Sequence, residues 1–302
     1  MSDVVAVSQD LAGTGPASGP DGAGRPRRRP RTGSDRWRRL VTPGLVVSAA
    51  VVVLAVLWAL FPTWFTGADP LVGVTSDSFS PPSGEYPFGT DQTGRDLYAR
   101  MVHGAGLSLQ ATVLAVAISL TVGTTLGLLA GFIGGVVDDV VMRSVDVLLA
   151  IPGLLLSLMI VTALGFGTIR VAVAVGVAGI AGFARVARSE VLRVRESLYV
   201  EAAFTSGARW PSVLLRHVVP NSAGPIISLA TLELGTAILA VSSLSFLGYG
   251  EPPPTPEWGV LVSEGRDFLA GAWWLSTLPG LVIVAVVLSF NRLSRAITAG
   301  TR

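Results

Sequence analysis

Two groups of charged residues in this sequence could do chemistry, and both lie beside long apolar runs. The first is a single acid, Glu233, near the middle of the apolar run 222–247. A carboxyl group in such surroundings could relay protons, or it could be a buried group that is protonated or hydrogen-bonded within the protein. The run contains no second acid and no histidine to complete a relay, so the structural interpretation is the simpler one.

The second group interrupts the apolar sequence at 199–225, which reads YVEAAFTSGARWPSVLLRHVVPNSAGP. Its start favours a short helix, and Gly207 would end that helix in a turn that needs a positive φ. Trp210-Pro211 predicts a second helix, because proline suits a first turn, and Pro220 would end it. The product would be a helix–turn–helix elbow. The alternative is a simple amphipathic connector on the membrane surface, which would need only a few residues.

The residues of common catalytic and metal sites are missing. The chain has no cysteine, and its two histidines, His103 and His217, lie far apart. It contains neither the GxxxxGK[ST] phosphate loop nor the HExxH and GxSxG motifs. We therefore expect no catalytic residue, no metal site and no cofactor on this chain.

The composition indicates which elements hold these charged groups. Half of the residues (50%) are hydrophobic and only 14% are charged, with a mean hydropathy of +0.62; soluble domains are about 25% charged. Apolar runs of roughly 20 residues can cross a bilayer as helices. Six runs qualify, at 43–65, 107–132, 147–166, 171–187, 222–247 and 273–290. The sequence therefore predicts an all-α polytopic membrane protein with six transmembrane helices and the elbow between the fourth and the fifth.

Arginine is distributed unevenly between the segments that connect these runs. If the first segment lies in the cytoplasm, 18 of the 22 arginines fall on the cytoplasmic side. The other four are Arg95, Arg100, Arg170 and Arg266. Because cytoplasmic loops usually carry the excess of positive charge, we expect both termini and the segment 188–220 to be cytoplasmic.

Residues 1–40 differ from the rest of the chain. They are rich in Gly, Pro and Ser, and then in arginine, so we expect a disordered cytoplasmic tail. Nucleic-acid binding by the arginines is a weaker interpretation than positive charge placed beside the first span. We divide the remainder into 41–106, a first transmembrane helix with an extracytoplasmic loop, and 107–298, a five-helix core that includes 188–220.

Glycines recur every four residues in the second apolar run, at Gly123, Gly127 and Gly131. This spacing puts them on one helix face, where the missing side chains allow another helix to approach closely. Helix packing is the main interpretation. A lining for a translocation path, to which Glu233 would also belong, is compatible with it.

The polar segment 85–100 contains Asp91, Arg95 and Asp96. We expect these residues to form an extracytoplasmic interface, near a docked partner or an outer gate. The alternative is that Asp91 and Arg95, four residues apart, pair with each other on a local helix.

Five segments in the same order resemble one protein family. EAA at 201–203, separated from Gly207 by three residues and followed later by RHVVPN, resembles the EAA motif of ABC importer permeases. Four other segments resemble the C-type permease subunit of the dipeptide/oligopeptide/nickel class: PFGTDQTGRDLYARMVHGAGLSL, DDVVMRSVDVLLAIPGLLL, LSFLGYGEPPPTPEWGVLVSEGR and AWWLSTLPGL. Together they cover about 40–292. The ending NRLSRAITAGTR departs from the family's usual Gly-Asp-x-Leu-Arg-Asp tail.

The resemblance implies a fold of the type I ABC importer kind and a set of partners. In a bacterial inner membrane, in contact with lipid, such a permease would pair with a B-type sister permease. Two cytoplasmic ATPase subunits would bind ATP and Mg, so this chain itself would not be an enzyme, and an extracytoplasmic solute-binding protein would deliver the solute. The residues that would couple to the ATPases are Glu201, Ala202, Ala203, Gly207, Arg216 and Pro220.

Other functions stay open at this point. Glu233 could serve a proton-coupled secondary transporter, or the basic tail could recruit a partner to a membrane-anchored scaffold. Within the resembled class the solute also stays open, because peptides are its commonest cargo but nickel is carried by similar permeases.

Overall fold

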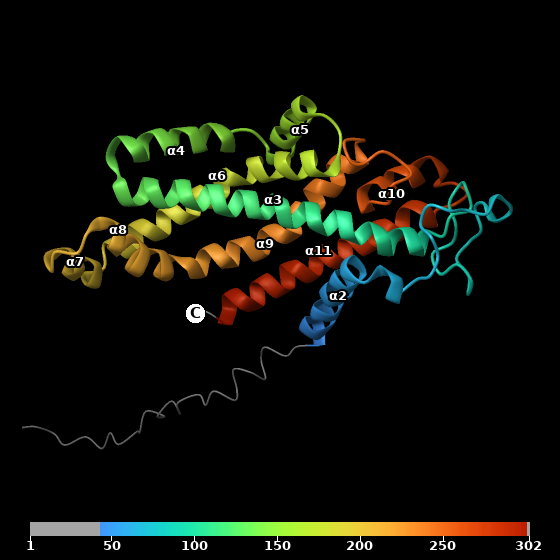
Figure 1. Cartoon of the computed structure of the whole chain (residues 1–302), viewed down its shortest axis with the longest axis horizontal. Coiled ribbons are helices and arrows are strands. Elements are labelled where there is room, and N and C mark those ends of the chain that lie inside the picture. The colour runs from blue at the N-terminus through green and yellow to red at the C-terminus, as the bar shows by residue number, and fades with distance from the viewer. Residues whose placement is uncertain (1–42, 301–302) are drawn as a thin grey trace, which may run out of the picture. The chain divides into compact units, whose positions relative to one another are not determined.

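The computed structural model describes residues 43–300, so the interpretations of the tail 1–40 lie outside the described residues. This part of the chain is helical, without a β-strand, and its helices follow one another along an antiparallel course (Figure 1). The elements are α2 Pro43–Leu60, α3 Leu97–Ile133, α4 Gly135–Leu149, α5 Gly153–Leu164, α6 Thr168–Arg195, α7 Leu198–Thr205, α8 Trp210–Val213, α9 Val219–Phe246, α10 Trp258–Gly265 and α11 Trp274–Gly300, with short 3₁₀ turns at Pro62–Trp64, Thr75–Asp77 and Arg266–Phe268 and a π turn at Leu214–Val218.

Five of the described helices are long and apolar enough to cross a membrane: α2, α3, α6, the continuous run Trp210–Phe246, and α11. The remaining expected span, the third in chain order at 147–166, is not one straight helix. α4 and α5 meet at an angle of 94°, and the pair makes a sixth crossing only if it is counted as one broken span. Pro152 lies at the break, where its ring and missing N–H prevent α4 from continuing.

α3 begins well before the apolar run that predicted it. It starts at Leu97 instead of 107 and has 37 residues, which corresponds to about 55 Å of helix. A bilayer core is about 30 Å thick, so α3 extends beyond it. Residues 97–106, which include Arg100 and His103, therefore belong to the helix and not to the preceding loop.

The glycines of α3 lie against α6. A Cβ atom at Gly123 would lie 2.5 Å from the carbonyl oxygen of Ile180, and one at Gly127 would lie closer still to that of Ala184. Further along the same pair of helices, Ser119 Oγ donates a hydrogen bond of 2.8 Å to the carbonyl oxygen of Gly176. Small residues thus bring the two backbones together.

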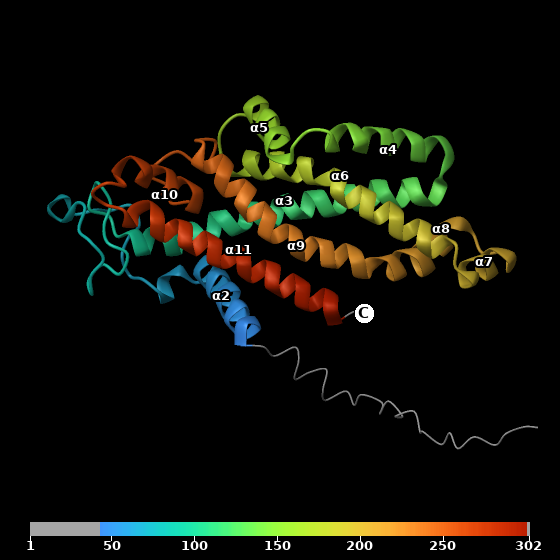
Figure 2. The ribbon, with the colours of Figure 1, turned by 180° about the vertical axis from the view of Figure 1, so that it is seen from behind.

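The two ends of this helical unit carry different elements. α7 and α8 lie at one end, the elbow end, and residues 61–96 and α10 lie at the other, the α10 end (Figures 1 and 2). α9 runs from the elbow end to the α10 end and packs against both α6 and α11. At the α10 end, Trp58, Trp258 and Trp274 belong to one buried apolar cluster that joins α2, α3, α10 and α11.

Candidate functional site

The turn of the elbow is built around Gly207, whose φ of +84° lies in the left-handed region expected from the sequence. α7 ends just before it. The amide of Ser206 donates to the carbonyl of Ala202 at 3.0 Å, and the amide of Ala208 donates to that of Ala203 at 3.1 Å. These bonds satisfy carbonyls that the end of a helix leaves without a partner.

The second helix of the elbow starts at Trp210, with Pro211 in its first turn, as predicted. It does not end at Pro220, and that prediction was wrong: α8 continues through the π turn into α9. The ring of Pro220 would crowd the carbonyl of Arg216, four residues earlier. The π turn widens the helix at this point, so the chain stays helical through the proline.

One side of the elbow is fixed to the rest of the protein. Val200 of α7 and Val213 of α8 are buried in an apolar cluster with residues from the ends of α3 and α6. The other members of this cluster are Phe132, Val191, Val194, Leu214 and Val218. The cluster therefore attaches the elbow to the ends of α3 and α6 and to the π turn that leads into α9.

The other side of the elbow is exposed and rich in large apolar side chains. Leu198 is 82% exposed and Leu215 66%, and Tyr199 and Trp210 are exposed as well. Of the residues expected to couple to ATPases, Glu201, Ala202, Gly207, Arg216 and Pro220 are exposed, and Ala203 is half-buried. Neither Glu201 nor Arg216 has an ion-pair partner within 43–300. The elbow therefore presents apolar and charged groups that nothing in the described chain covers.

A hollow of about 370 Å³ opens between α5, α6 and α9 in the membrane-spanning part. Its lining is mostly small or apolar and is contributed by Leu149, Gly153, Leu154, Ser157, Val175, Ala178, Gly179, Gly182, Glu233, Thr236, Ala237, Leu239, Ala240 and Ser243. Glu233 is the one charged residue in this lining. The structure thus separates Glu233 from Gly123, Gly127 and Gly131, which pack on the far side of α6 and do not line the hollow.

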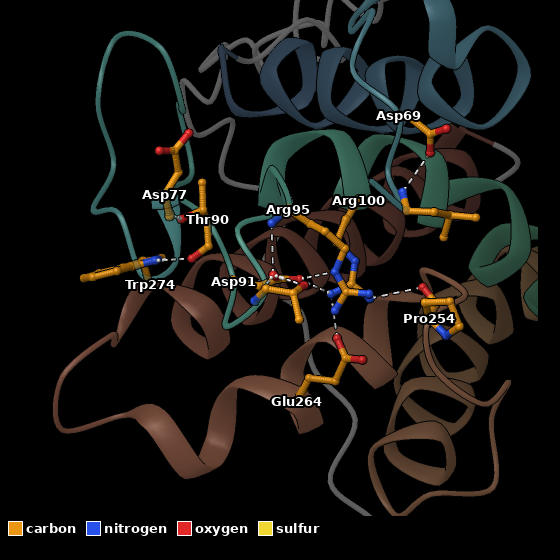
Figure 3. Close-up of polar contacts among 11 residues, drawn as sticks. Asp69, Asp77, Thr90, Asp91, Arg95, Arg100, Pro254, Glu264 and Trp274 are labelled. Atoms are coloured by element: carbon orange, nitrogen blue, oxygen red, sulfur yellow. Dashed lines mark hydrogen bonds and ion pairs between the residues drawn. The ribbon is translucent and has the colours of Figure 1, made fainter. Parts of the chain in front are cut away.

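Three charged residues of the segment 85–100, namely Asp91, Arg95 and Arg100, form a buried network at the α10 end (Figure 3). Asp91 Oδ2 accepts from Arg95 Nε at 2.6 Å and from Arg100 Nη1 at 2.9 Å. Arg100 also reaches Glu264 Oε2 of α10 at 2.7 Å. Asp91 is 2% exposed and Arg100 1%. In this conformation the network joins the loop to α10 and offers little of Asp91 or Arg95 to a partner.

Backbone amides around this network stabilise the charged form of Asp91. Asp91 and Arg95 pair in a turn, not on a helix, and the Asp91 carboxylate also accepts from the backbone amides of Thr93 and Arg95. Burial alone would raise the pKa of Asp91, but these hydrogen bonds and the charge of Arg100 outweigh it, so the pKa is lowered.

Asp96 does not take part in the ion pairs of Asp91 and Arg95. It is the N-cap of α3 and accepts from the amide of Tyr98 at 2.8 Å. Burial raises its pKa in spite of that bond. Asp96 therefore fixes the start of α3, a helix start that the apolar pattern placed ten residues later.

A second buried carboxylate, Glu257, was not among the expected site residues. It is 0% exposed and precedes α10. Its oxygens accept from the hydroxyls of Thr168, at 2.9 Å, and Ser245. Thr168 begins α6 and Ser245 lies near the end of α9. Glu257 therefore connects α6, α9 and α10 by hydrogen bonds at the α10 end. Only its place in the run EPPPTPEW, directly before an apolar helix, could have drawn attention to it in the sequence.

With this geometry established, comparison with known proteins shows the family. Residues 123–302 match the model of the family described as "Binding-protein-dependent transport system inner membrane component". The chain belongs to this family. It is also 36% identical over 256 residues to the probable D,D-dipeptide transport system permease protein DdpC of Escherichia coli (strain K12), covering 84% of this chain and 86% of DdpC. It is 41% identical over 259 residues to the glutathione transport system permease protein GsiD of Shigella flexneri serotype 5b (strain 8401), covering 85% and 86%.

Solved structures agree at the level of the fold. The inward-facing MetNI methionine ABC transporter has a chain that matches with a TM-score of 0.52 at 15% identity, over 66% of this chain and 96% of that one. A chain of an amino acid ABC transporter with histidines matches with a TM-score of 0.51 at 15% identity, over 67% and 94%. The protein is therefore a multi-pass membrane permease of a binding-protein-dependent transport system, and nothing in these comparisons supports the proton-coupled alternative.

Proposed function

We propose that this permease is one half of the membrane channel of an ATP-driven importer of small peptides. Its partners would be a B-type sister permease, two cytoplasmic ATPase subunits and an extracytoplasmic solute-binding protein. The ATPases would bind and hydrolyse ATP with Mg at their own sites. The elbow end and both termini would face the cytoplasm, in agreement with the arginine distribution.

The exposed face of the elbow is the observation that carries the proposal. Leu198 and Leu215 are largely exposed on short helices at the end of the bundle, where a second protein could cover them. Exposed apolar groups rimmed by charge are typical of protein–protein contacts. The charges here are Glu201 and Arg216, which have no ion-pair partner in the described chain. An ATPase surface fits this face better than lipid does.

The elbow's attachment supports a coupling mechanism. α7 and α8 pack on the ends of α3 and α6, and α8 continues without a break into α9. A movement of docked ATPases would therefore tilt α6 and α9, two of the helices that line the hollow. Rigid-body rocking of this kind would open the path first to one side of the membrane and then to the other.

Small peptides are the proposed solute because of the relatives. DdpC, 36% identical, is described as a probable D,D-dipeptide transport permease, and GsiD, 41% identical, as a glutathione transport permease. A hollow of about 370 Å³ is at the lower end of the size of small-molecule sites in proteins.

Substitution of Gly207 tests the coupling. Gly207 has a positive φ and open space around it, so Gly207→Asp strains the backbone by about 1–3 kcal/mol and fills only the space that a docked partner would need. In the assembled complex in lipid we expect normal membrane insertion, weakened retention of the ATPase subunits, and lost uptake.

Gly248 provides the matched control. Its φ is +96°, it also has open space around it, and it lies at the α10 end. Gly248→Asp imposes the same kind of strain, and we expect it to leave ATPase retention at the wild-type level. Equal retention in the Gly207→Asp and wild-type complexes, with wild-type uptake, would remove the coupling assignment.

A further inference from the structure

The hollow between α5, α6 and α9 has one charged side chain in an otherwise small and apolar lining. Gly153 and Gly182, where an added Cβ atom would have nothing within 4 Å, belong to its lining, and Glu233 projects from the middle turn of α9. Glu233 is 14 residues after Val219 and 13 before Phe246, which is about 20 Å from either end of α9. A carboxylate at this depth cannot be satisfied by lipid and must face protein or water.

The side chain of Glu233 is only partly satisfied by the protein. Thr236 Oγ1 donates to Glu233 Oε2 at 2.6 Å. The ion pairs among the described residues include none with Glu233, and the hollow's lining contains no arginine or histidine. Oε1 is therefore free to accept a hydrogen bond from whatever occupies the hollow.

We infer that Glu233 binds the ammonium group of the solute as it passes through the hollow. The free amino terminus of a small peptide carries this group, with three N–H donors and a full positive charge. A charge-assisted hydrogen bond to Oε1 is among the strongest that a carboxylate can form, and it gains strength where water is scarce. The rest of the peptide would then contact the small apolar lining.

This arrangement makes Glu233 a residue that selects by charge. A neutral or acidic group at the same place would give the carboxylate no cationic partner, so solutes without an ammonium group would pass less readily. The inference rests on the proposed function, because it assumes that α6 and α9 line the route of a peptide.

The experiment uses the full transporter, with its binding protein, in proteoliposomes that contain ATP. Uptake of a radiolabelled dipeptide with a free amino terminus and uncharged side chains is measured together with ATP hydrolysis stimulated by the loaded binding protein. For Glu233→Gln we expect uptake about tenfold lower, which is about 1.4 kcal/mol, with at least half of the stimulated ATP hydrolysis retained. Glu233→Asp should stay within about threefold of wild type, and Glu233→Lys should abolish uptake.

Controls separate this inference from its alternatives. Asp139→Asn removes an exposed carboxylate outside the hollow and should leave both activities unchanged. Wild-type uptake in Glu233→Gln, or equal loss of uptake and ATP hydrolysis in Glu233→Gln and Glu233→Asp, would overturn the inference. So would a collapse of wild-type uptake under a protonophore with ATP present, because it would make Glu233 a proton site. Wild-type complexes that hydrolyse ATP but carry no peptide would instead overturn the proposed function.

Discussion

Single residues at the α10 end show how this protein keeps charges in its interior. Arg100 is buried, and its two carboxylate partners come from the loop before α3 and from α10. Removing one member of such a group leaves an unpaired buried charge, which costs more than the intact pair contributes. Asp91 is the best single test, because it contacts both Arg95 and Arg100.

Asp91→Asn should destabilise the protein by about 3–5 kcal/mol. The lowered pKa of Asp91 means that its contribution is complete above the ordinary carboxyl pKa of about 3.9 and is lost as the pH falls through the lower, folded value. Thermal unfolding in nanodiscs from pH 7 down to pH 3 should therefore show a large difference between variant and wild type that narrows in acid.

The control for this measurement is Asp267→Asn. Asp267 is 75% exposed on its side chain and pairs with Arg266 at 3.4 Å, so its removal should change stability by less than about 1 kcal/mol. A gap between wild type and Asp91→Asn that stays constant over the whole pH range would show that the ionised network is not what stabilises the α10 end.

Helices and turns show what the sequence could and could not predict. The elbow, the glycine turn and five of the spans followed from local patterns of apolar residues, glycine and proline. The start of α3 did not follow from them, because the charge of Arg100 favours a loop when the sequence is read locally. Its partner Glu264 lies 164 residues away in the sequence, and only the fold brings the two together. The helix through Pro220 was missed for a related reason: a proline indicates a stop locally, and only the π turn shows how the chain continues.

The close packing between the helices α3 and α6 gives a testable prediction. A Cβ atom at Gly127 would collide with the backbone at Ala184 and also lie 2.8 Å from the Cβ atom of Ala187. Because neither atom can move without a shift of α6, Gly127→Ala should cost about 1–3 kcal/mol.

Gly280 in α11 is the matched site for this substitution, because it has nothing within 4 Å of an added Cβ atom and is not followed by a proline. Gly280→Ala should be neutral or stabilise the protein by up to about 1 kcal/mol, since alanine is the better helix former. Thermal unfolding of both variants in nanodiscs compares the two sites. Equal stability of Gly127→Ala and wild type would show that α3 and α6 are not held this closely together.

At the scale of the whole molecule, the elbow end and the α10 end have different designs. At the α10 end, the buried carboxylates of Asp91 and Glu257 and the partly buried one of Glu264 join elements distant in sequence. The elbow end has an exposed apolar face instead. α6 and α9 connect the two, with the hollow between them. We propose that the ATPase subunits dock at the elbow, so that their movement reaches the hollow through α6 and α9.

Site-specific crosslinking tests that claim most directly, and the absence of native cysteine makes it practical. Leu198→Cys and Ile169→Cys place single thiols at exposed positions near opposite ends of α6, where the native side chains are 82% and 70% exposed. Each variant is labelled with a benzophenone maleimide in the assembled, ATP-hydrolysing complex and then irradiated. We expect a crosslink to the ATPase subunit from position 198 and no crosslink to that subunit from position 169. A crosslink to the ATPase subunit from position 169, or none from position 198 in a complex that still transports, would contradict docking at the elbow.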